Sequence, residues 1–436
     1  MDPITIGILS FAALAVMLVL TIPIGVAMAL AGLGGTAAII GTNASVSLFA
    51  TTVYSTTVTY ELSIVPLFVL MGALAARSGL SRELYDVFNV WLGRFRGGLA
   101  IATIGACGAF AAICGSSLAT AATMSRVALP EMERHNYADS LATGAVASGG
   151  VIGILIPPSV ILVLYGILTE TSIGDLFIAG VIPGLLSILG FMLIIAIITH
   201  IWPDLGPAGE KTSWHAKLSA LARTWAIILL FAIVIGGIYL GVFTPTEAAG
   251  IGAVGAFAIA AMRRRLTWST FVDALLETVQ TSAMIFTVLV GAVTLNNLTI
   301  FSGLAGALGG FVSGLEMHPM AVMAIILLMY LVLGCFLDAL AMILLTVPIF
   351  FPIVTGLGFD GVWFGIIVVM VAELGLITPP IGMNVFVIKG MAPQVALGSI
   401  YRGVMPFVFA QLVLIALVFL LPQLALWLPE TAASFR

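Results

Sequence analysis

Charged side chains are scarce in this sequence. Asp, Glu, Lys and Arg make up 8% of the 436 residues, whereas a soluble domain carries about a quarter. Runs without any of these four residue types, such as Ile182–Ile201 and Trp225–Gly241, have the length that a membrane span requires. A soluble fold would have to expose much of the 61% of hydrophobic residues to water. The sequence therefore predicts an all-α protein that crosses a membrane several times.

Cysteine and histidine are also rare, with three cysteines and four histidines. No two cysteines form a CxxC pair and the histidines are scattered, so neither a redox centre nor a metal cluster is expected. The net charge of −4 argues against nucleic acid as a partner. An intramembrane hydrolase would need a Ser–His, paired-Asp or zinc arrangement at membrane depth. The sequence indicates none of these, so we do not expect an enzyme.

The same pattern of cysteine and helix-interrupting proline residues occurs twice along the chain. The landmarks that recur are Cys114, Pro130, Pro157-Pro158 and Pro183 in the first half, and Cys335, Pro352, Pro379-Pro380 and Pro406 in the second. Their offsets are 221, 222, 222 and 223 residues. This register predicts repeats over 46–200 and 279–428, with scaffold helices in 1–45 and 201–278 and a tail in 429–436. Repeats with interrupted hydrophobic segments at matching positions are typical of secondary transporters.

Each repeat contains a segment that is too long for one span and is bent in its middle. We predict re-entrant hairpins over 98–134 and 319–357, and broken helices over 138–167 and 360–388. The remaining predicted spans are 4–20, 22–42, 46–76, 176–200, 224–242, 246–262, 279–298 and 401–428. The first span is not read as a cleaved signal peptide, because Met1-Asp2-Pro3 lacks a basic region.

Arginine placement orients the two repeats. The arm before the first hairpin, 77–97, carries four arginines, whereas the corresponding arm 299–318 carries no Arg or Lys. The positive-inside rule places the first arm and the middle segment, which includes Lys211 and Arg263-Arg264-Arg265, on the cytoplasmic side. The repeats are therefore predicted to be inverted, with both termini periplasmic. The amphipathic part of the first arm, 80–96, should lie in the interface plane.

The proline pairs are candidate parts of a binding site. Because proline has no N–H, Pro157-Pro158 should free the carbonyls of Gly153 and Ile154, and Pro379-Pro380 those of Gly375 and Leu376. Free carbonyls at half-helix ends are ligands for sodium, and the half-helices that follow direct positive dipole ends toward a carboxylate. The alternative is a pair of proline kinks without any ligand.

The hairpin tips should face these breaks. We predict two sodium sites, formed by Ser116, Ser117, Gly150 and Gly153 in the first repeat and by Gly334, Leu337, Asp338, Gly375 and Thr378 in the second. Candidate substrate contacts are Ser117, Thr120, Arg126, Pro158, Ser159, Ile381 and Asn384. Ser117 and Asp338 could also act as helix N-caps, and Arg126 could extend to the cytoplasmic interface instead of meeting an anion. Glu61, Glu247 and Glu373 are expected to support helix packing.

The sequence resembles the large membrane subunit of tripartite ATP-independent periplasmic (TRAP) transporters over essentially its whole length. The runs that carry the resemblance are Gly115-Ser116-Ser117, Ser148–Ser159, Phe336-Leu337-Asp338, Thr346–Phe350 and Gly375–Asn384. One departure is Arg134-His135-Asn136-Tyr137, where the family often has a glycine before the tyrosine; this turn lies outside the predicted site.

The resemblance implies a sodium-driven elevator of the ion-transporter superfamily in the bacterial inner membrane. It also implies a small four-helix membrane subunit, a periplasmic binding protein that delivers an organic acid anion, and surrounding lipid. A separate small subunit is expected because no extra four-span block precedes Met1. The alternative is a stand-alone sodium-coupled carrier of the divalent-anion or citrate type, which would be expected to carry Ser-Asn-Thr at both hairpin tips.

Overall fold

The computed structural model describes residues 1–209, 212–314 and 317–433. Lys211, residues 315–316 of the second arm and residues 434–436 of the tail lie outside these ranges. The described residues form α-helices and short 3-10 turns without a strand, which confirms the predicted all-α class. Six of the described helices are individually long and apolar enough to cross a membrane: Tyr60–Arg77, Ile173–Ile201, Pro245–Met262, Trp268–Ser302, Ala339–Gly356 and Leu397–Leu420. The chain is thus a multi-pass membrane protein.

The two halves contain the same order of elements. The first has a helical hairpin of α6 (Gly98–Cys114) and α7 (Ser117–Arg134), a broken helix of α8 (Asp139–Val151) and α9 (Val160–Thr169), and the long α10 (Ile173–Ile201). The second has the hairpin of α16 (Pro319–Gly334) and α17 (Ala339–Gly356), the broken helix of α18 (Gly361–Gly375) and α19 (Met383–Met391), and the long α20 (Leu397–Leu420). The predicted hairpins and breaks are therefore present as helix–interruption–helix units.

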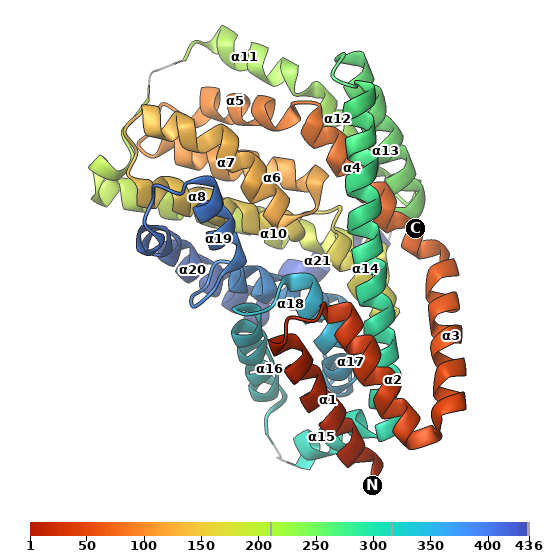
Figure 1. Cartoon of the computed structure of the whole chain (residues 1–436). Helices are drawn as coiled ribbons and strands as arrows, with labels where there is room; N and C mark the ends of the chain where they lie inside the picture. The colour runs from red at the N-terminus through yellow and green to blue at the C-terminus, as the bar shows by residue number, and fades with distance from the viewer. Residues whose placement is uncertain (210–211, 315–316, 434–436) are drawn as a thin grey trace.

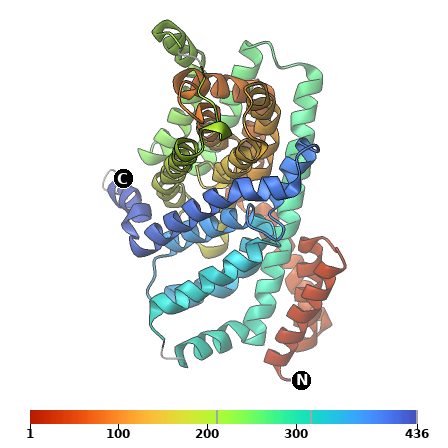
Figure 2. The same ribbon diagram turned by 90° about the vertical axis from the view of Figure 1, so that its left-hand side faces the viewer.

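A second group of helices packs along α14 (Trp268–Ser302), which runs down one side of the molecule in Figure 1. Those in contact with α14 are α1 (Pro3–Val19), α2 (Ile24–Ile40), α3 (Thr42–Val58) and α4 (Ile64–Arg77). Helix α13 (Pro245–Met262) packs on α4, and α12 (Trp225–Tyr239) packs on α13. Contact between α2 and α14 is closest where Gly25 meets Gly291, because a Cβ on Gly291 would lie 2.2 Å from the Gly25 carbonyl oxygen. Small residues allow such approach between membrane helices. In Figure 2, α14 runs beside helices from both the first and the second half of the chain.

The remaining helices are short and lie at the ends of these groups. They are α5 (Leu80–Leu92), α11 (Trp214–Arg223), α15 (Leu304–Gly314) and α21 (Gln423–Ala433). Helix α5 packs on α6, since a Cβ on Gly105 would lie 2.6 Å from the ring of Phe88. Lys217 of α11 lies between the rings of Trp91 and Trp214, at 5.5 and 5.0 Å from their centroids.

Several predicted boundaries differ from the structure. The division at 45 and 46 falls inside α3, and the predicted start of the second arm at 299 falls inside α14. The span 46–76 is two helices, α3 and α4, because Thr59 is extended and Tyr60–Ser63 form a 3-10 turn. The division at 278 and 279 falls inside α14, whose 35 residues continue without a capping residue at that point. The division at 428 and 429 falls inside α21. In each case the apolar stretch of the sequence and the helix end at different residues. Hydropathy alone does not show where a helix is capped.

Candidate functional site

The first hairpin tip is a sharp turn that places two serines against the first break. Gly115 has φ +62°, a conformation that favours glycine, and Ser116 has extended angles as the N-cap of α7. The Ser116 hydroxyl accepts a hydrogen bond from the N–H of Ala119 at 3.4 Å. Ser117 was predicted as the cap, but it is already helical; its buried hydroxyl instead donates to the Val151 carbonyl at 3.4 Å.

The glycines of α8 and the first break allow this approach. A Cβ on Gly150 would lie 3.1 Å from the Ser117 carbonyl oxygen, and one on Gly153 would lie 3.3 Å from that of Ser116. Tip and break therefore meet backbone to backbone. The residues predicted for the first sodium site lie together, but the carbonyl that the Ser117 hydroxyl meets is that of Val151, which was not among them.

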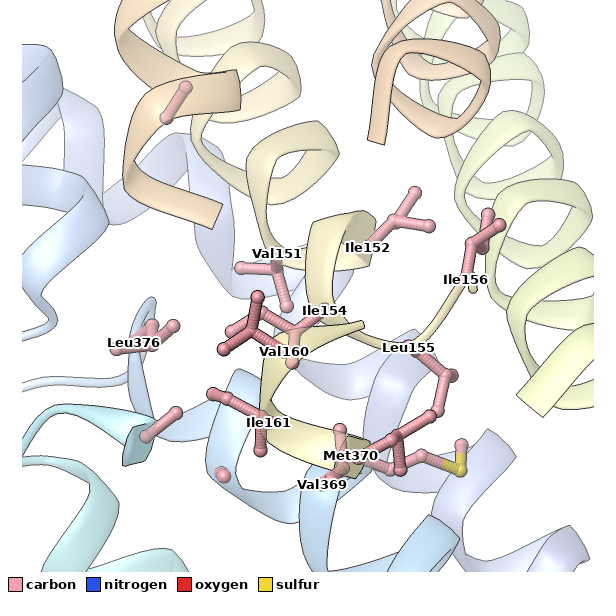
Figure 3. Packing of buried hydrophobic residues seen from close by; sticks show 14 of the residues in the cluster. Val151, Ile152, Ile154, Leu155, Ile156, Val160, Ile161, Val369, Met370 and Leu376 are labelled. Carbon is pink, nitrogen blue, oxygen red and sulfur yellow. The ribbon is translucent and has the colours of Figure 1, made fainter. Parts of the chain in front are cut away.

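The first break is stabilised by an acid from the other repeat. Glu373, on α18, is 1% exposed, and its carboxyl group accepts from the N–H of Ile154 at 3.0 Å and from the N–H of Leu155. These N–H groups belong to the irregular segment before Pro157, whose apolar neighbours are shown in Figure 3. Because unpaired buried N–H groups are costly, Glu373 supplies the acceptor that the interrupted helix lacks. The expectation that Glu373 supports packing is confirmed.

The second tip and break make the equivalent contact. A Cβ on Gly375 would lie 2.4 Å from the carbonyl carbon of Gly334 and 2.6 Å from its oxygen. Asp338 is the N-cap of α17, as predicted, and its Oδ1 accepts from the N–H of Ala341 at 2.7 Å. Leu337 lies between these residues in the tip. The predicted members of the second site are thus brought together as well.

The carbonyls of the second break are not free, contrary to prediction. Gly375 accepts from the N–H of Thr378 at 3.2 Å, and Leu376 accepts from the N–H of Asn384 at 3.0 Å. The hydroxyl of Thr378 also donates, to the Leu374 carbonyl at 2.6 Å. The first bond closes a tight turn just before the proline pair, and the second forms because the chain turns back after the pair and brings Asn384 to Leu376. A carbonyl has a second lone pair, so these oxygens can still face an ion, but only as shared acceptors.

One cavity of about 550 Å³ connects these features. Its lining includes Ser116, Ser117 and Asp338 from the two tips, and Ile154 and Leu376 from the two breaks. In Figure 3, Leu376 lies across from Ile154, Val160 and Ile161. The cavity therefore lies where the two repeats meet.

The cavity extends to the C-terminal end of α4 and to the N-terminal half of α14. Arg77 and Glu277 line it there and form an ion pair, with 2.5 Å between Nη1 and Oε2. Arg126, on α7, also lines the cavity; it is exposed and has no ion-pair partner within the described residues. The cavity is thus lined by one guanidinium without an ion-pair partner among the described residues.

The other predicted substrate contacts lie outside this lining. Thr120, Pro158 and Ser159 are buried, and the Ser159 hydroxyl caps α9 by accepting from the N–H of Leu162 at 3.3 Å. Asn384 is buried too and donates to the Ala147 carbonyl at 3.2 Å, which ties α19 to α8. Ile381 is 37% exposed and is not among the lining residues. In the arrangement seen here, only Ser117 and Arg126 of the proposed substrate contacts face the cavity.

The other two acids singled out in the sequence lie away from the cavity. Glu247 forms a capping box with Thr244 at the start of α13, accepting from its N–H at 2.8 Å. Glu61 is exposed in the 3-10 turn before α4. Neither contributes to the core of the site, and the turn that holds Glu61 replaces the continuous helix expected there.

Comparison with solved structures identifies the fold. The crystal structure of the Alcanivorax borkumensis YdaH transporter superposes with a TM-score of 0.64 over 90% of each chain, at 16% sequence identity. At this identity the likeness concerns the fold alone. It is the fold of a membrane transporter.

Sequence comparison is more specific. The chain is 37% identical over 387 residues to the C4-dicarboxylate TRAP transporter large permease protein DctM of Pseudomonas aeruginosa, covering 88% of this chain and 90% of that protein. It is 33% identical to the sialic acid permease SiaM of Vibrio cholerae, covering 85% and 86%. A longer relative, the isethionate permease DctMQ of Oleidesulfovibrio alaskensis, is 33% identical; it matches 96% of this chain, which spans 65% of that protein.

The family model of the DctM component of tripartite ATP-independent periplasmic transporters matches residues 11–424. The match includes both tips and both breaks that line the cavity. The chain is accordingly a transport protein rather than an enzyme, and it belongs to the DctM family of TRAP transporter large permeases.

Proposed function

We propose that this chain imports a small organic acid anion across the bacterial inner membrane in symport with sodium. The observation that carries the proposal is a cavity lined by both hairpin tips and both helix breaks. A carboxylate there would meet the hydroxyls of Ser116 and Ser117 on one side and the guanidinium of Arg126 toward the exit. The substrates for which the relatives are named, C4-dicarboxylates and sialic acid among them, are of this chemical class.

Two sodium ions fit the oxygen groups at the tip–break junctions. Sodium prefers hydroxyl, carbonyl and carboxylate oxygens, and both junctions present them on irregular backbone that membrane proteins retain where it lines a cavity. The first junction offers Ser117 and the Val151 carbonyl, which already lie 3.4 Å apart. The second offers the shared carbonyls of Gly375 and Leu376, with Asp338 nearby. The two sites would therefore differ in ligand strength.

In this proposal the hairpins and broken helices move as one body along the helices packed on α14. The cavity ends at Arg77, on the arginine-rich side that the positive-inside rule assigns to the cytoplasm. The arrangement described is then the inward-facing one, with inverted repeats and both termini in the periplasm. Return to the outward-facing state would carry the tips and breaks past α4 and α14.

The proposal includes two protein partners. A small membrane subunit is supported by the longer DctMQ relative, which contains sequence beyond the part matched by this chain. A periplasmic binding protein is supported by the family description itself. Both would act on the scaffold and on the periplasmic surface, and lipid would surround the rest.

Uptake by purified proteins in liposomes tests the proposal. The chain, its small subunit and the binding protein should together accumulate an organic acid when sodium is imposed outside, and omission of either partner should abolish accumulation. Accumulation driven by a proton gradient without sodium would disprove the sodium assignment. Accumulation of free substrate by this chain alone would favour a stand-alone carrier of the divalent-anion type.

A further inference from the structure

The short helix α11 exposes a row of large apolar side chains. Trp214, Leu218 and Leu221 recur at helical spacing, and each is at least 42% exposed. The opposite face of the helix is occupied, because Lys217 is buried against Trp91 of α5. At the upper edge of Figure 1, α11 lies outside α5 and leads into α12. The exposed row therefore faces away from the helices on which α11 packs.

This row continues onto the next helix. Helices α11 and α12 are together long and apolar enough for a membrane span, and they meet at a bend of 50°. Beyond the bend, Trp225, Ile228 and Leu229 are exposed at the same helical spacing. A continuous apolar strip thus runs from the short helix onto the span. An amphipathic helix of this kind lies at the membrane interface with its apolar side in lipid.

Arginines from neighbouring elements gather beside the strip. Arg263, at the end of α13, donates to the Arg223 carbonyl at 3.3 Å, which brings the ends of α11 and α13 together. The guanidinium carbon of Arg265 lies 3.9 Å from where a Cβ on Gly79 would be, just before α5. Arg82 is on the first turn of α5. Arg82, Arg223 and Arg265 are exposed residues.

The arginines outnumber the carboxylates that face them. Glu83 is already in an ion pair with Arg263, with 2.5 Å between Oε1 and Nη1. Burial raises the pKa of Asp86, whereas the charges of Arg82 and Arg223 lower it, so both arginines lie near this one carboxylate. None of the three exposed arginines forms an ion pair within the described part of the chain. The cluster therefore has positive charge left for an anion from outside the chain.

Exposed tryptophans indicate the depth of the cluster in the membrane. Trp225 begins α12 and Trp268 begins α14, and both are exposed beside the arginines. Indole rings concentrate at the level of the lipid headgroups. Two such rings on either side of the cluster are the second observation, besides charge, that points to lipid. The guanidinium groups should accordingly lie at the level of the lipid phosphates.

We infer that this corner binds an anionic phospholipid, with its phosphate between Arg82, Arg223 and Arg265 and its acyl chains along the strip from Trp214 to Leu229. A phosphate accepts the paired hydrogen bonds that a guanidinium offers, and the acyl chains replace water on the strip. Basic pockets beside membrane helices suit anionic headgroups for these reasons. The bound lipid would link α5 to the ends of α11 and α13. The inference goes beyond the proposed function, because it needs only a chain that spans a membrane.

Native mass spectrometry of the purified chain in a neutral detergent measures the affinity for added lipid. Phosphatidylglycerol should bind more tightly than phosphatidylcholine with the same acyl chains. Arg223→Gln and Arg265→Gln should each weaken phosphatidylglycerol binding about fivefold and leave phosphatidylcholine binding unchanged, because each removes one charge beside the headgroup. The matched control is Arg402→Gln, which removes an exposed arginine of α20 and should bind as the wild type does. Leu218→Ser should weaken the binding of both lipids, since it interrupts the apolar strip.

Three results would overturn the inference. The first is equal affinity of the wild type for both lipids, or unchanged phosphatidylglycerol binding in both arginine variants. The second is displacement of the lipid by an equal concentration of inorganic phosphate, which would identify a site for a free anion. The third is loss of lipid binding when the small membrane subunit is added, because the strip would then be a protein interface. None of these measurements involves the transported solute or sodium, so each result leaves the proposed function standing.

Discussion

Replacement of Glu373 tests how the first break is held together. Its carboxyl group accepts from two buried backbone N–H groups, those of Ile154 and Leu155. Glu373→Met keeps an apolar stem of similar length but offers no strong acceptor. Each buried N–H left unpaired costs about 1–3 kcal/mol, so this variant should lose about 2–6 kcal/mol of stability. Glu373→Gln retains a carbonyl oxygen that can accept from both donors, and it should lose much less.

Thermal unfolding of the purified protein in detergent measures the difference. The Met variant should melt well below the Gln variant, and the Gln variant close to wild type. Glu133→Met and Glu133→Gln, at an exposed position of α7, control for the loss of charge and should melt together. Equal melting temperatures of Glu373→Met and Glu373→Gln would show that the two hydrogen bonds do not stabilise the break.

Three further outcomes are expected. Asp338→Asn should raise the sodium concentration for half-maximal uptake while keeping its helix cap. Asp360→Asn, the same change at the N-cap of α18, should leave the sodium dependence unchanged. Equal effects of the two substitutions would exclude a special role of Asp338 in sodium binding. Gly375→Ala should destabilise the protein by about 1–3 kcal/mol and impair uptake, because its Cβ would meet the second tip 2.4 Å away; wild-type unfolding and uptake would contradict the close contact. Cysteines introduced in 80–96 should react with an impermeant maleimide only from the cytoplasm, and those in 304–310 only from the periplasm; reaction of both from one side would disprove the inverted orientation.

Local chemistry explains what was predictable. Proline pairs, a Gly-Ser-Ser tip and a Leu-Asp tip interrupt helices through the residues themselves, so both hairpins and both breaks were found at the expected positions. Asp338 was likewise recognisable as a cap from its place before an apolar helix. Ser116 rather than Ser117 caps α7, because a cap depends on which of two adjacent serines adopts extended angles.

The composition of the chain and the positions of its prolines by themselves determined the membrane class and the paired helix interruptions, since these depend on hydropathy and on missing N–H groups within a few residues. Only the tertiary structure decided which groups meet across the repeats. The acid that completes the first break is 219 residues from the N–H of Ile154, and the carbonyls of Gly375 and Leu376 are taken by N–H groups of a turn that sequence alone does not place. Hydrogen-bond partners depend on distance in space and on direction, and these are fixed only when the helices pack.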